Sequence, residues 1–162
     1  KYIMNKYTIK TENIYNLRLF GVYGELDNWR YRFISNICCH AVFDMSINIH
    51  QNAVFDFLYI DDLVKIIQWF IDNKTKHNVY NVCSGKVYEY LDLADKIINI
   101  SGKKLDIIIE NSGNQIEYSG DNSKLLSELD KFDFISMDES LKAMYKWYDE
   151  HRGNIDPDKF HY

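Results

Sequence analysis

Cysteine and proline are scarce in this 162-residue chain, which has three cysteines and a single proline, Pro157. Two of the cysteines, Cys38 and Cys39, are adjacent, and Cys83 stands apart without a C-x-x-C pattern. An odd, sparse set of this kind is neither a disulfide framework nor a zinc-binding pattern. The five histidines are scattered and lack the H-E-x-x-H spacing of a metal site. We therefore expect buried or half-buried thiols in a reducing cytosol and no metal site.

Long apolar runs and clusters of positive charge are scarce as well. The apolar runs are far shorter than the roughly 18 residues of a membrane span, and the opening KYIMNKYTIK lacks the apolar core of a signal peptide. The net charge is -5, and no basic stripe is present that could neutralise the phosphates of a nucleic acid. The sequence therefore predicts a cytoplasmic protein that binds neither membranes nor nucleic acids.

Glycine is also sparse, with seven residues, and no pair of glycines builds a G-x-G-x-x-G loop between a strand and a helix. Such a loop, which opens onto a helix N-terminus, normally holds the pyrophosphate of a dinucleotide. The sequence therefore offers no obvious cradle for NAD or NADP. We expect the chain by itself not to bind either cofactor tightly.

The residues that are present have a globular composition: 46% are apolar, 27% charged and 15% aromatic. This suits one domain with a sizeable core. Strand-like and amphipathic helical stretches alternate, which predicts an α/β fold with some parallel strand pairing. We expect helices over residues 1–12, 33–42, 61–71, 91–102 and 121–129, and one from residue 136 onward. We expect strands over residues 13–24, 46–49, 54–60 and 104–109, a strand followed by a turn over 79–85, and a polar loop over 110–120.

Local signals mark several boundaries. Asp61 and Asp62 precede an apolar stripe and are interpreted as a helix start, because aspartate caps exposed N–H groups and suits the helix dipole. A catalytic pair of carboxylates is the alternative. Ser136 and Glu139 have the spacing of a capping box. The first helix begins without a cap, which suggests a chain that starts inside an element. The tail over residues 154–162 is expected to be loose.

Several segments, in order and at matching distances, are similar to motifs of one enzyme family. KYIMNKY at the start resembles the continuation of a helix that carries a Y-x-x-x-K motif. The other segments are LRLFGVYG (17–24, family LRxFNVYG), FDFLYIDDLV (55–64, family RDFxYVDDxA), YNVCSG (80–85, family YNxGSG) and YSGDNSKLLSEL (118–129, family xxxDxSKxxxEL). Each is weak alone, but together they cover nearly the whole chain. The chain thus resembles the C-terminal half of NAD-dependent nucleotide-sugar epimerases and dehydratases of the extended short-chain dehydrogenase/reductase family.

The resemblance implies a fold and a chemistry. Residues 1–162 would form one domain, with residues 1–24 ending the Rossmann-like NAD(P)-binding part and the rest forming the small substrate-binding part. The full-length protein would bind NAD or NADP and a nucleotide sugar, and would form a homodimer. The family oxidises a sugar carbon while a tyrosine transfers the hydroxyl proton. A neighbouring lysine lowers the pKa of that tyrosine, which is otherwise near 10.

The resemblance carries over to only a few site residues. Lys1 matches the motif lysine, which is catalytic and cofactor-binding, and its tyrosine would lie four residues earlier; a solvated terminal lysine is the alternative. Phe20 matches the aromatic residue beside the nicotinamide, or is simply a buried strand residue. Gly21 takes the substrate-facing place where the family often has an asparagine.

The sequence departs from the family where phosphate is held. Phe55 stands in place of the RDF arginine, and residues 111–114 stand in place of a loop that supplies a second arginine. Arginine forks suit phosphate by charge and bidentate geometry. Arg30 and Arg32 are candidates to bind the substrate instead, and with the neighbouring tryptophan and tyrosine they could stack a base or a sugar. An ordinary surface loop is the alternative.

Two functions therefore remain open. The first is a fragment of a nucleotide-sugar epimerase, dehydratase or reductase that binds the sugar substrate. The second is a non-catalytic binding or interaction module that retains the fold. The missing arginines favour the second, whereas Lys1 and Phe20 favour the first. In either case we expect the isolated chain to be inactive, because the motif tyrosine is not part of it.

Overall fold

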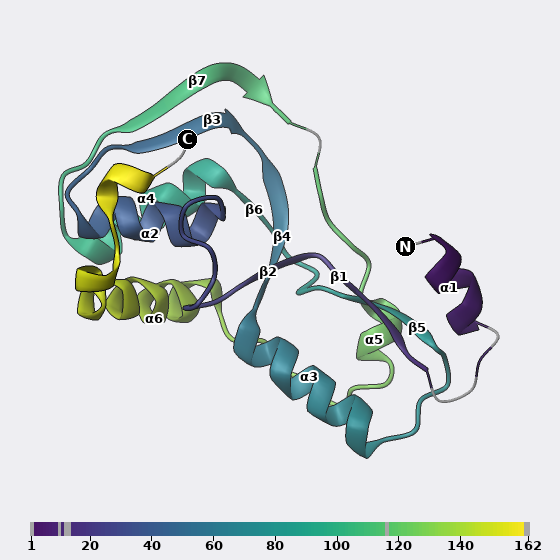
Figure 1. The fold of residues 1–162 in the computed structure, drawn as a ribbon. Coiled ribbons are helices and arrows are strands. Elements are labelled where there is room, and N and C mark those ends of the chain that lie inside the picture. Colours follow the sequence, from purple (N-terminus) through teal and green to yellow (C-terminus); the bar gives the residue numbers. More distant parts are fainter. Residues whose placement is uncertain (1, 10, 12–13, 116, 161–162) are drawn as a thin grey trace.

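The structure is a computed structural model that describes residues 2–9, 11, 14–115 and 117–160. The α-helices are α1 (Tyr2–Ile9), α2 (Phe33–Val42), α3 (Ile60–Asp72), α4 (Tyr90–Ser101), α5 (Ser123–Leu126) and α6 (Met137–Glu150). The strands are β1 (Asn16–Leu19), β2 (Gly21–Tyr23), β3 (Ile47–Asn52), β4 (Val54–Tyr59), β5 (Val79–Val82), β6 (Val87–Glu89) and β7 (Ile107–Asn114). Two short 3-10 helices, η1 (Arg152–Asn154) and η2 (Pro157–Lys159), follow α6. Helices and strands alternate along the chain (Figure 1), which confirms the predicted α/β class.

Strand β4 lies between the two ends of the molecule (Figure 1). It pairs in parallel with β2 and antiparallel with β6. At one end, β1 pairs in parallel with β5, near α1, α3 and α5; at the other end, β3 pairs in parallel with β7, beside α2, α4 and α6 (Figure 1). These parallel pairs require long crossover connections, and helices supply them.

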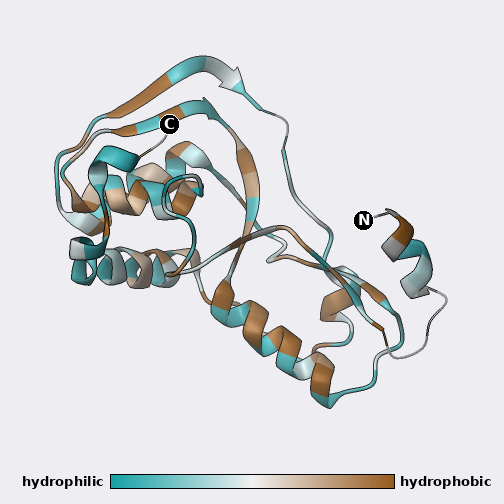
Figure 2. Cartoon of the chain, viewed as in Figure 1, coloured by the Kyte–Doolittle hydropathy of each residue, from teal (hydrophilic) through white to brown (hydrophobic). Residues whose placement is uncertain are grey.

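Two hydrophobic clusters fill the two ends. The larger lies among α2, α4 and α6 and includes the fully buried Leu93. The smaller lies under α3 and includes the fully buried Ile66. Figure 2 shows the hydrophobic residues recurring along α3 and β4. Because side chains alternate along a strand, β4 serves both clusters: Leu58 belongs to the smaller one, and Phe57 and Tyr59 belong to the larger one.

The helix boundaries follow their sequence signals. α2 covers residues 33–42 as predicted, and Gly102 ends α4 with a φ of 67°, in the left-handed region that favours glycine. The Ser136 hydroxyl accepts a hydrogen bond from the Glu139 N–H, and the Glu139 carboxylate accepts one from the Ser136 N–H, which confirms the capping box. Local signals of this kind need no knowledge of the tertiary fold.

The segment expected as one strand over residues 13–24 contains two strands. β1 ends at Leu19 and β2 begins at Gly21, with Phe20 between them. The chain changes its partner at this point, from β5 to β4. Because the two partners are different strands, one uninterrupted ladder is not formed.

Two further expectations about the second half are wrong. The loop expected over residues 110–120 is partly strand, since β7 continues to Asn114 beside β3; β6 was not expected at all. The tail is not loose over its described part, because Ile155 and Phe160 are only 8% and 7% exposed and pack into the larger cluster. In both cases the reason is tertiary contact that a polar local sequence does not indicate.

Asp61 and Asp62 occupy the first turn of α3, where negative charge suits the helix dipole. The N-cap is Tyr59, however, and it makes no side-chain capping bond, so the expected capping role of the aspartates is wrong. Asp62 is 1% exposed, and its carboxylate accepts a hydrogen bond from the Ile135 N–H at 2.8 Å. Asp61 is exposed. The two residues therefore do not share a buried site.

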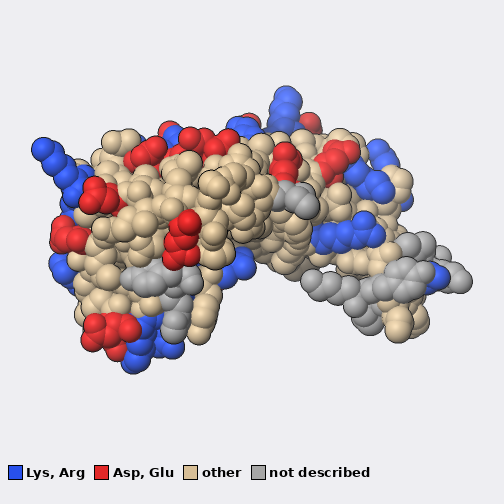
Figure 3. Space-filling view, turned by 90° about the horizontal axis from the view of Figure 1, so that it is seen from above, with Lys and Arg blue, Asp and Glu red and all other residues tan. Residues whose placement is uncertain are grey.

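The described surface carries both signs of charge. Figure 3 shows lysines and arginines interspersed with aspartates and glutamates on the face seen from above, so neither sign dominates that face. Within the described ranges, each helix is too short or too polar to cross a lipid bilayer.

Asp56 on β4 is a fully buried carboxylate. One of its oxygens accepts hydrogen bonds from the N–H and the hydroxyl of Ser84, both at 2.8 Å, and the other accepts from the Gly85 N–H at 2.9 Å. Gly85 has a φ of 76°, which a glycine adopts without strain. Asp56 thereby fastens the turn after β5 to the central strand.

We expect Asp56→Ala to lower the free energy of unfolding by about 3 kcal/mol, because a hydrogen bond to a charged group contributes about 1.5–3 kcal/mol. Urea unfolding followed by circular dichroism measures the change. Asp133→Ala, which removes an exposed carboxylate, is the matched control and should alter the stability little. An Asp56→Ala midpoint equal to that of Asp133→Ala would contradict this role.

Candidate functional site

A cavity of about 350 Å3 lies where β2, β3 and β4 approach the segment that precedes α2. This volume is within the range of small-molecule sites. The rings of Phe33, Phe55 and Tyr90 line it, and so do the cationic residues Arg30 and Arg32. The cavity therefore combines flat apolar surfaces with positive charge.

The candidate residues named from the sequence meet at this cavity. Phe20, Gly21, Arg30 and Arg32 all line it. The first two come from the junction of β1 and β2, and the arginines come from the loop over residues 25–32. Lys1 lies outside the described residues. A shared ligand site requires such convergence, although convergence alone does not assign a role to any residue.

The two arginines are held in different ways. The Arg32 Nε donates a hydrogen bond to the Asp27 carboxylate at 3.2 Å, and its Nη2 donates to the Val22 carbonyl at 3.0 Å. The Arg30 guanidinium lies over the Trp29 ring, 5.1 Å from its centroid, in the arrangement of a cation–π contact. The Arg32 side chain is still 51% exposed. Both guanidinium groups are thus oriented without being buried.

A row of aromatic rings forms one wall of the cavity. Phe33 and Tyr90 stack with centroids 3.7 Å apart and 9° between their planes. Phe55 lies 5.4 Å from Tyr90 and 5.4 Å from Tyr118, which in turn lies 5.3 Å from Phe20. Burial raises the pKa of the Tyr90 hydroxyl, and the charge of a nearby arginine partly offsets this shift. The Tyr90 hydroxyl is therefore protonated and uncharged at neutral pH.

Sequence reasoning missed the polar residues opposite the candidates. Asn48, His50 and Gln51 on β3 line the cavity, and so does Gln115 after β7. The His50 Nδ1 lies 2.6 Å from a carboxylate oxygen of Glu110 on β7. The polar content of β3 was visible in the sequence. Its position beside the 25–32 loop depends on how β3 and β4 fold back, which no local pattern specifies.

A second hollow, of about 620 Å3, lies beside β1 and β5 at the other end of the molecule. Arg18, Lys76 and Lys124 line it, and the Arg18 Nη2 donates a hydrogen bond to the Asn5 side-chain oxygen at 2.8 Å. Among the described residues that line it, none is a phenylalanine, tyrosine or tryptophan. This hollow is larger, but it contains none of the candidate residues, so the smaller cavity is the candidate site.

The thiols and the acidic and histidine side chains are distributed as follows. Within the part of the chain that the structure describes, no three His, Cys, Asp or Glu side chains are grouped as a metal site requires. The thiols of Cys38, Cys39 and Cys83 are fully buried, as expected, and burial raises the pKa of each. A protonated, buried thiol is a poor nucleophile and a poor ligand. The cavity is equipped for recognition by charge, ring faces and amides.

Gly21 has a structural reason for being glycine. A Cβ at this position would lie 2.6 Å from the Asp56 carbonyl oxygen and 3.0 Å from the Phe57 ring. Gly21 pairs directly with Phe57 in the β2–β4 ladder. The close approach of β2 and β4 therefore leaves no space for an asparagine side chain, which the family that this sequence resembles often has at this position.

We expect Gly21→Ala to lower the free energy of unfolding by about 1–3 kcal/mol, the usual cost of inserting atoms into a packed site. A thermal melt measures the effect. Gly153→Ala is the matched control, because a Cβ at Gly153 has no atom within 4 Å. The steric account fails if the two variants melt at the same temperature.

Comparison with known proteins identifies the family of the chain. The model of the NAD dependent epimerase/dehydratase family matches residues 2–83, which are 82 of the 162 residues. The ADP-L-glycero-D-manno-heptose-6-epimerase of Brachyspira hyodysenteriae is 27% identical over 92 residues, covering 50% of this chain and 27% of that protein. The match therefore concerns a part of that enzyme.

Solved structures share the fold at low identity. The UDP-glucose 4-epimerase of Thermotoga maritima with UDP-glucose has a TM-score of 0.75 at 17% identity, covering 93% of this chain and 51% of that one. The UDP-glucuronic acid 4-epimerase of Bacillus cereus with UDP-glucuronic acid and NAD has a TM-score of 0.74 at 24% identity, covering 85% and 46%. The chain thus spans about half the length of these enzymes. By its match to the family model, the chain belongs to the NAD-dependent epimerase/dehydratase family, with the fold of the extended short-chain dehydrogenases/reductases.

Proposed function

We propose that the chain is the C-terminal, substrate-binding half of an NAD(P)-dependent nucleotide-sugar epimerase or dehydratase, and that the cavity between β2, β3 and β4 binds the nucleotide sugar. The observation that carries this proposal is the convergence of Phe20, Gly21, Arg30 and Arg32 on one cavity in a chain of this family. Enzymes of the same fold were solved with UDP-glucose and with UDP-glucuronic acid. A nucleotide sugar is therefore the ligand class that the family favours.

In this proposal the diphosphate lies against the 25–32 loop. A diphosphate needs positive charge close by, and Phe55 provides none at the place of the family arginine. Arg32 is the better placed of the two cations, because its Nε and one Nη are held by Asp27 and Val22 while half of the side chain stays open to a ligand. A pre-oriented guanidinium binds phosphate with a smaller loss of side-chain entropy. Arg30 adds a second charge from the same loop.

The remainder of the cavity suits the rest of such a ligand. The exposed parts of Tyr90 and Phe55 offer flat surfaces on which a nucleobase can stack. The side-chain amides of Asn48 and Gln51 can donate to and accept from the edge of a base. Phe20, at the end of the row of rings that is distant from Phe33, and the adjacent Gly21 then face the sugar.

Among the described residues, Phe20 is the candidate for a part of the cofactor site. The Phe20 ring packs closely on Gly120, where a Cβ would lie 2.5 Å from the ring. Such a fixed ring fits one wall of a nicotinamide site, but the sequence has no glycine loop for the pyrophosphate. NAD or NADP, when bound by the full-length protein, supplies the hydride transfer. The proposed task of this chain is to bind and orient the sugar nucleotide.

Two other features bear on the proposal. The loss of the family arginines favours a non-catalytic binding module as the second candidate function.

The exposed apolar side chains of Ile3 and Tyr7 on α1, and of Val64 and Ile71 on α3, are 80%, 61%, 58% and 71% exposed. Exposed apolar patches often mark contact surfaces. They support the further proposal that the full-length protein is a homodimer.

We expect Arg32→Ala in the full-length protein to weaken the binding of UDP about tenfold to a hundredfold. A charge-assisted hydrogen bond contributes about 1.5–3 kcal/mol, and each 1.4 kcal/mol is about a factor of ten. Isothermal titration with UDP as the probe measures the dissociation constant, with the variants compared at equal folded fraction.

Arg18→Ala is the matched control, because Arg18 donates to Asn5 outside the cavity. It should reduce the stability and leave the UDP affinity unchanged. Binding of UDP by the Arg32→Ala protein with the affinity of the parent would place the phosphate elsewhere. No binding of UDP, GDP or dTDP by the parent would reject the nucleotide-sugar proposal itself.

A further inference from the structure

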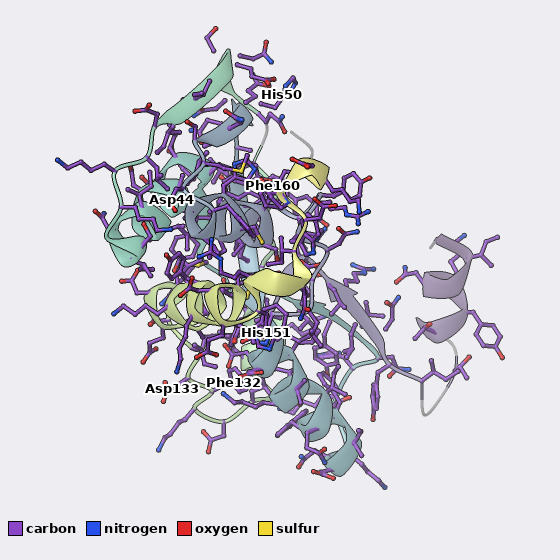
Figure 4. All side chains as sticks on the ribbon, turned by 60° about the vertical axis from the view of Figure 1, so that its left-hand side comes forward. Asp44, His50, Phe132, Asp133, His151 and Phe160 are labelled. Carbon is purple, nitrogen blue, oxygen red and sulfur yellow. The ribbon has the colours of Figure 1, made fainter. Side chains whose placement is uncertain are left out.

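The last described residue of the C-terminal tail is a buried aromatic residue, Phe160. Phe160 is 7% exposed and lies beside α2, in the tail that follows α6 (Figure 4). Its ring centroid lies 4.8 Å from that of His40, 5.3 Å from that of Trp29 and 5.9 Å from that of Phe43. These three side chains form the socket of Phe160.

The socket is apolar in character although it contains a histidine. Burial lowers the pKa of His40, and a hydrogen bond to the Ser46 carbonyl partly offsets this shift. The imidazole is therefore neutral at neutral pH and packs as a flat ring against Phe160, at an angle of 27°. Charge in the socket does not oppose the docking of the tail.

Local contacts within the tail order the turn that precedes Phe160. The Asp156 carboxylate accepts a hydrogen bond from the Asp158 N–H at 3.2 Å. It also forms an ion pair with the Lys159 ammonium group at 2.8 Å. Pro157 begins the short helix η2, where its fixed φ is already suitable. Ile155, 8% exposed, anchors the beginning of this turn. The turn thus has its own local order in addition to the contact made by Phe160.

Trp29, a residue of the socket, contacts two residues that line the cavity, Arg30 and Asn36. The Phe160 ring meets the Trp29 ring nearly at a right angle, at 87°. The guanidinium of Arg30, which lines the cavity, lies over the same tryptophan. The Trp29 carbonyl also accepts a hydrogen bond from Asn36, another residue of the cavity wall, at 3.1 Å. Any movement of Trp29 therefore changes the support of Arg30.

From this geometry we infer that Phe160 is a positioning residue for the substrate site: docked in its socket, it fixes Trp29 and thereby holds Arg30 and the 25–32 loop in the conformation that binds the ligand phosphate. The C-terminal tail is on this account a strap across the back of the phosphate-binding loop. The claim about the ligand rests on the proposed function, whereas the claim about the loop does not.

Hydrogen exchange on the full-length protein tests the strap directly. The amides of Tyr31 and Arg32 donate to the Asn28 carbonyl at 3.1 and 2.9 Å, so their exchange reports the order of the loop. In Phe160→Ala we expect these amides to exchange at least about tenfold faster than in the parent, because the loop opens locally once Trp29 is released. In Phe160→Tyr, which keeps the ring, they should exchange as in the parent.

Phe70→Ala is the control for a general loss of stability. Phe70 is 6% exposed, a burial close to that of Phe160, but it belongs to the smaller cluster under α3. This variant should be destabilised as much as Phe160→Ala and yet leave the exchange of the loop amides unchanged. If Phe160→Ala fails to fold, Phe160→Leu takes its place, with a smaller rise in exchange expected.

Binding of UDP gives the second reading. We expect Phe160→Ala to raise the dissociation constant of UDP about threefold to tenfold. Phe160→Tyr should bind UDP with the dissociation constant of the parent. If the parent does not bind UDP, the proposed function fails, and the exchange data still decide whether the strap exists. Loop amides that exchange equally in Phe160→Ala and the parent, or equally in Phe160→Ala and Phe70→Ala, would overturn the inference.

Discussion

The buried carboxylate of Asp56 is the interaction on which the arrangement of the site depends. It sits on β4 and accepts three hydrogen bonds from the turn at Ser84 and Gly85, so that β4 and the segment after β5 keep one relative position. The strand that it fixes carries Phe55 and Phe57 to the cavity wall. A buried charge is costly unless it is fully paired, and the pairing here makes other positions of the turn unfavourable. The wall of the cavity that carries Phe55 and Phe57 is thus built on a rigid strand.

The helices were the predictable part of the fold. The apolar stripe of α3, the capping box of α6 and the glycine that ends α4 are local features, and the structure has each of these helices close to its predicted place. The strands were less predictable, because their boundaries depend on partners. Phe20 interrupts what reads as one strand since the chain changes partner there, and β7 extends through Ser112 and Gly113 because β3 lies alongside.

The candidate site was predicted on one side only. Phe20 and Gly21 came from a motif, and Arg30 and Arg32 came from a loop whose cations could replace the missing family arginines. The structure places all four on one cavity. The amides of β3 and the stacked ring of Tyr90 could not be found in this way, because they come from segments distant in sequence that meet only in three dimensions. The buried Phe160 was missed for a related reason: the tail around it is polar, and a single apolar residue gives no periodic signal.

The substitution of the family arginine by Phe55 gives the cavity its particular character. Among the described residues that line the cavity, arginine and lysine occur only in the 25–32 loop, and the centre of the wall is a row of aromatic rings. A ligand with one anionic portion and one flat portion is complementary to that distribution. In the proposed function this loop supplies the positive charge for the phosphate, so it must keep one conformation. The contacts of Arg32 with Asp27 and Val22, and of Arg30 with Trp29, are suited to that task.

The most direct test of this account is a crystal structure of the full-length protein with UDP-glucose. The account predicts the diphosphate within hydrogen-bonding distance of the Arg32 guanidinium, with the uracil ring against Tyr90 or Phe55 and the glucose ring beside Phe20. A ligand bound in the hollow formed by Arg18, Lys76 and Lys124, or one bound in the cavity without contact to Arg32, would contradict it.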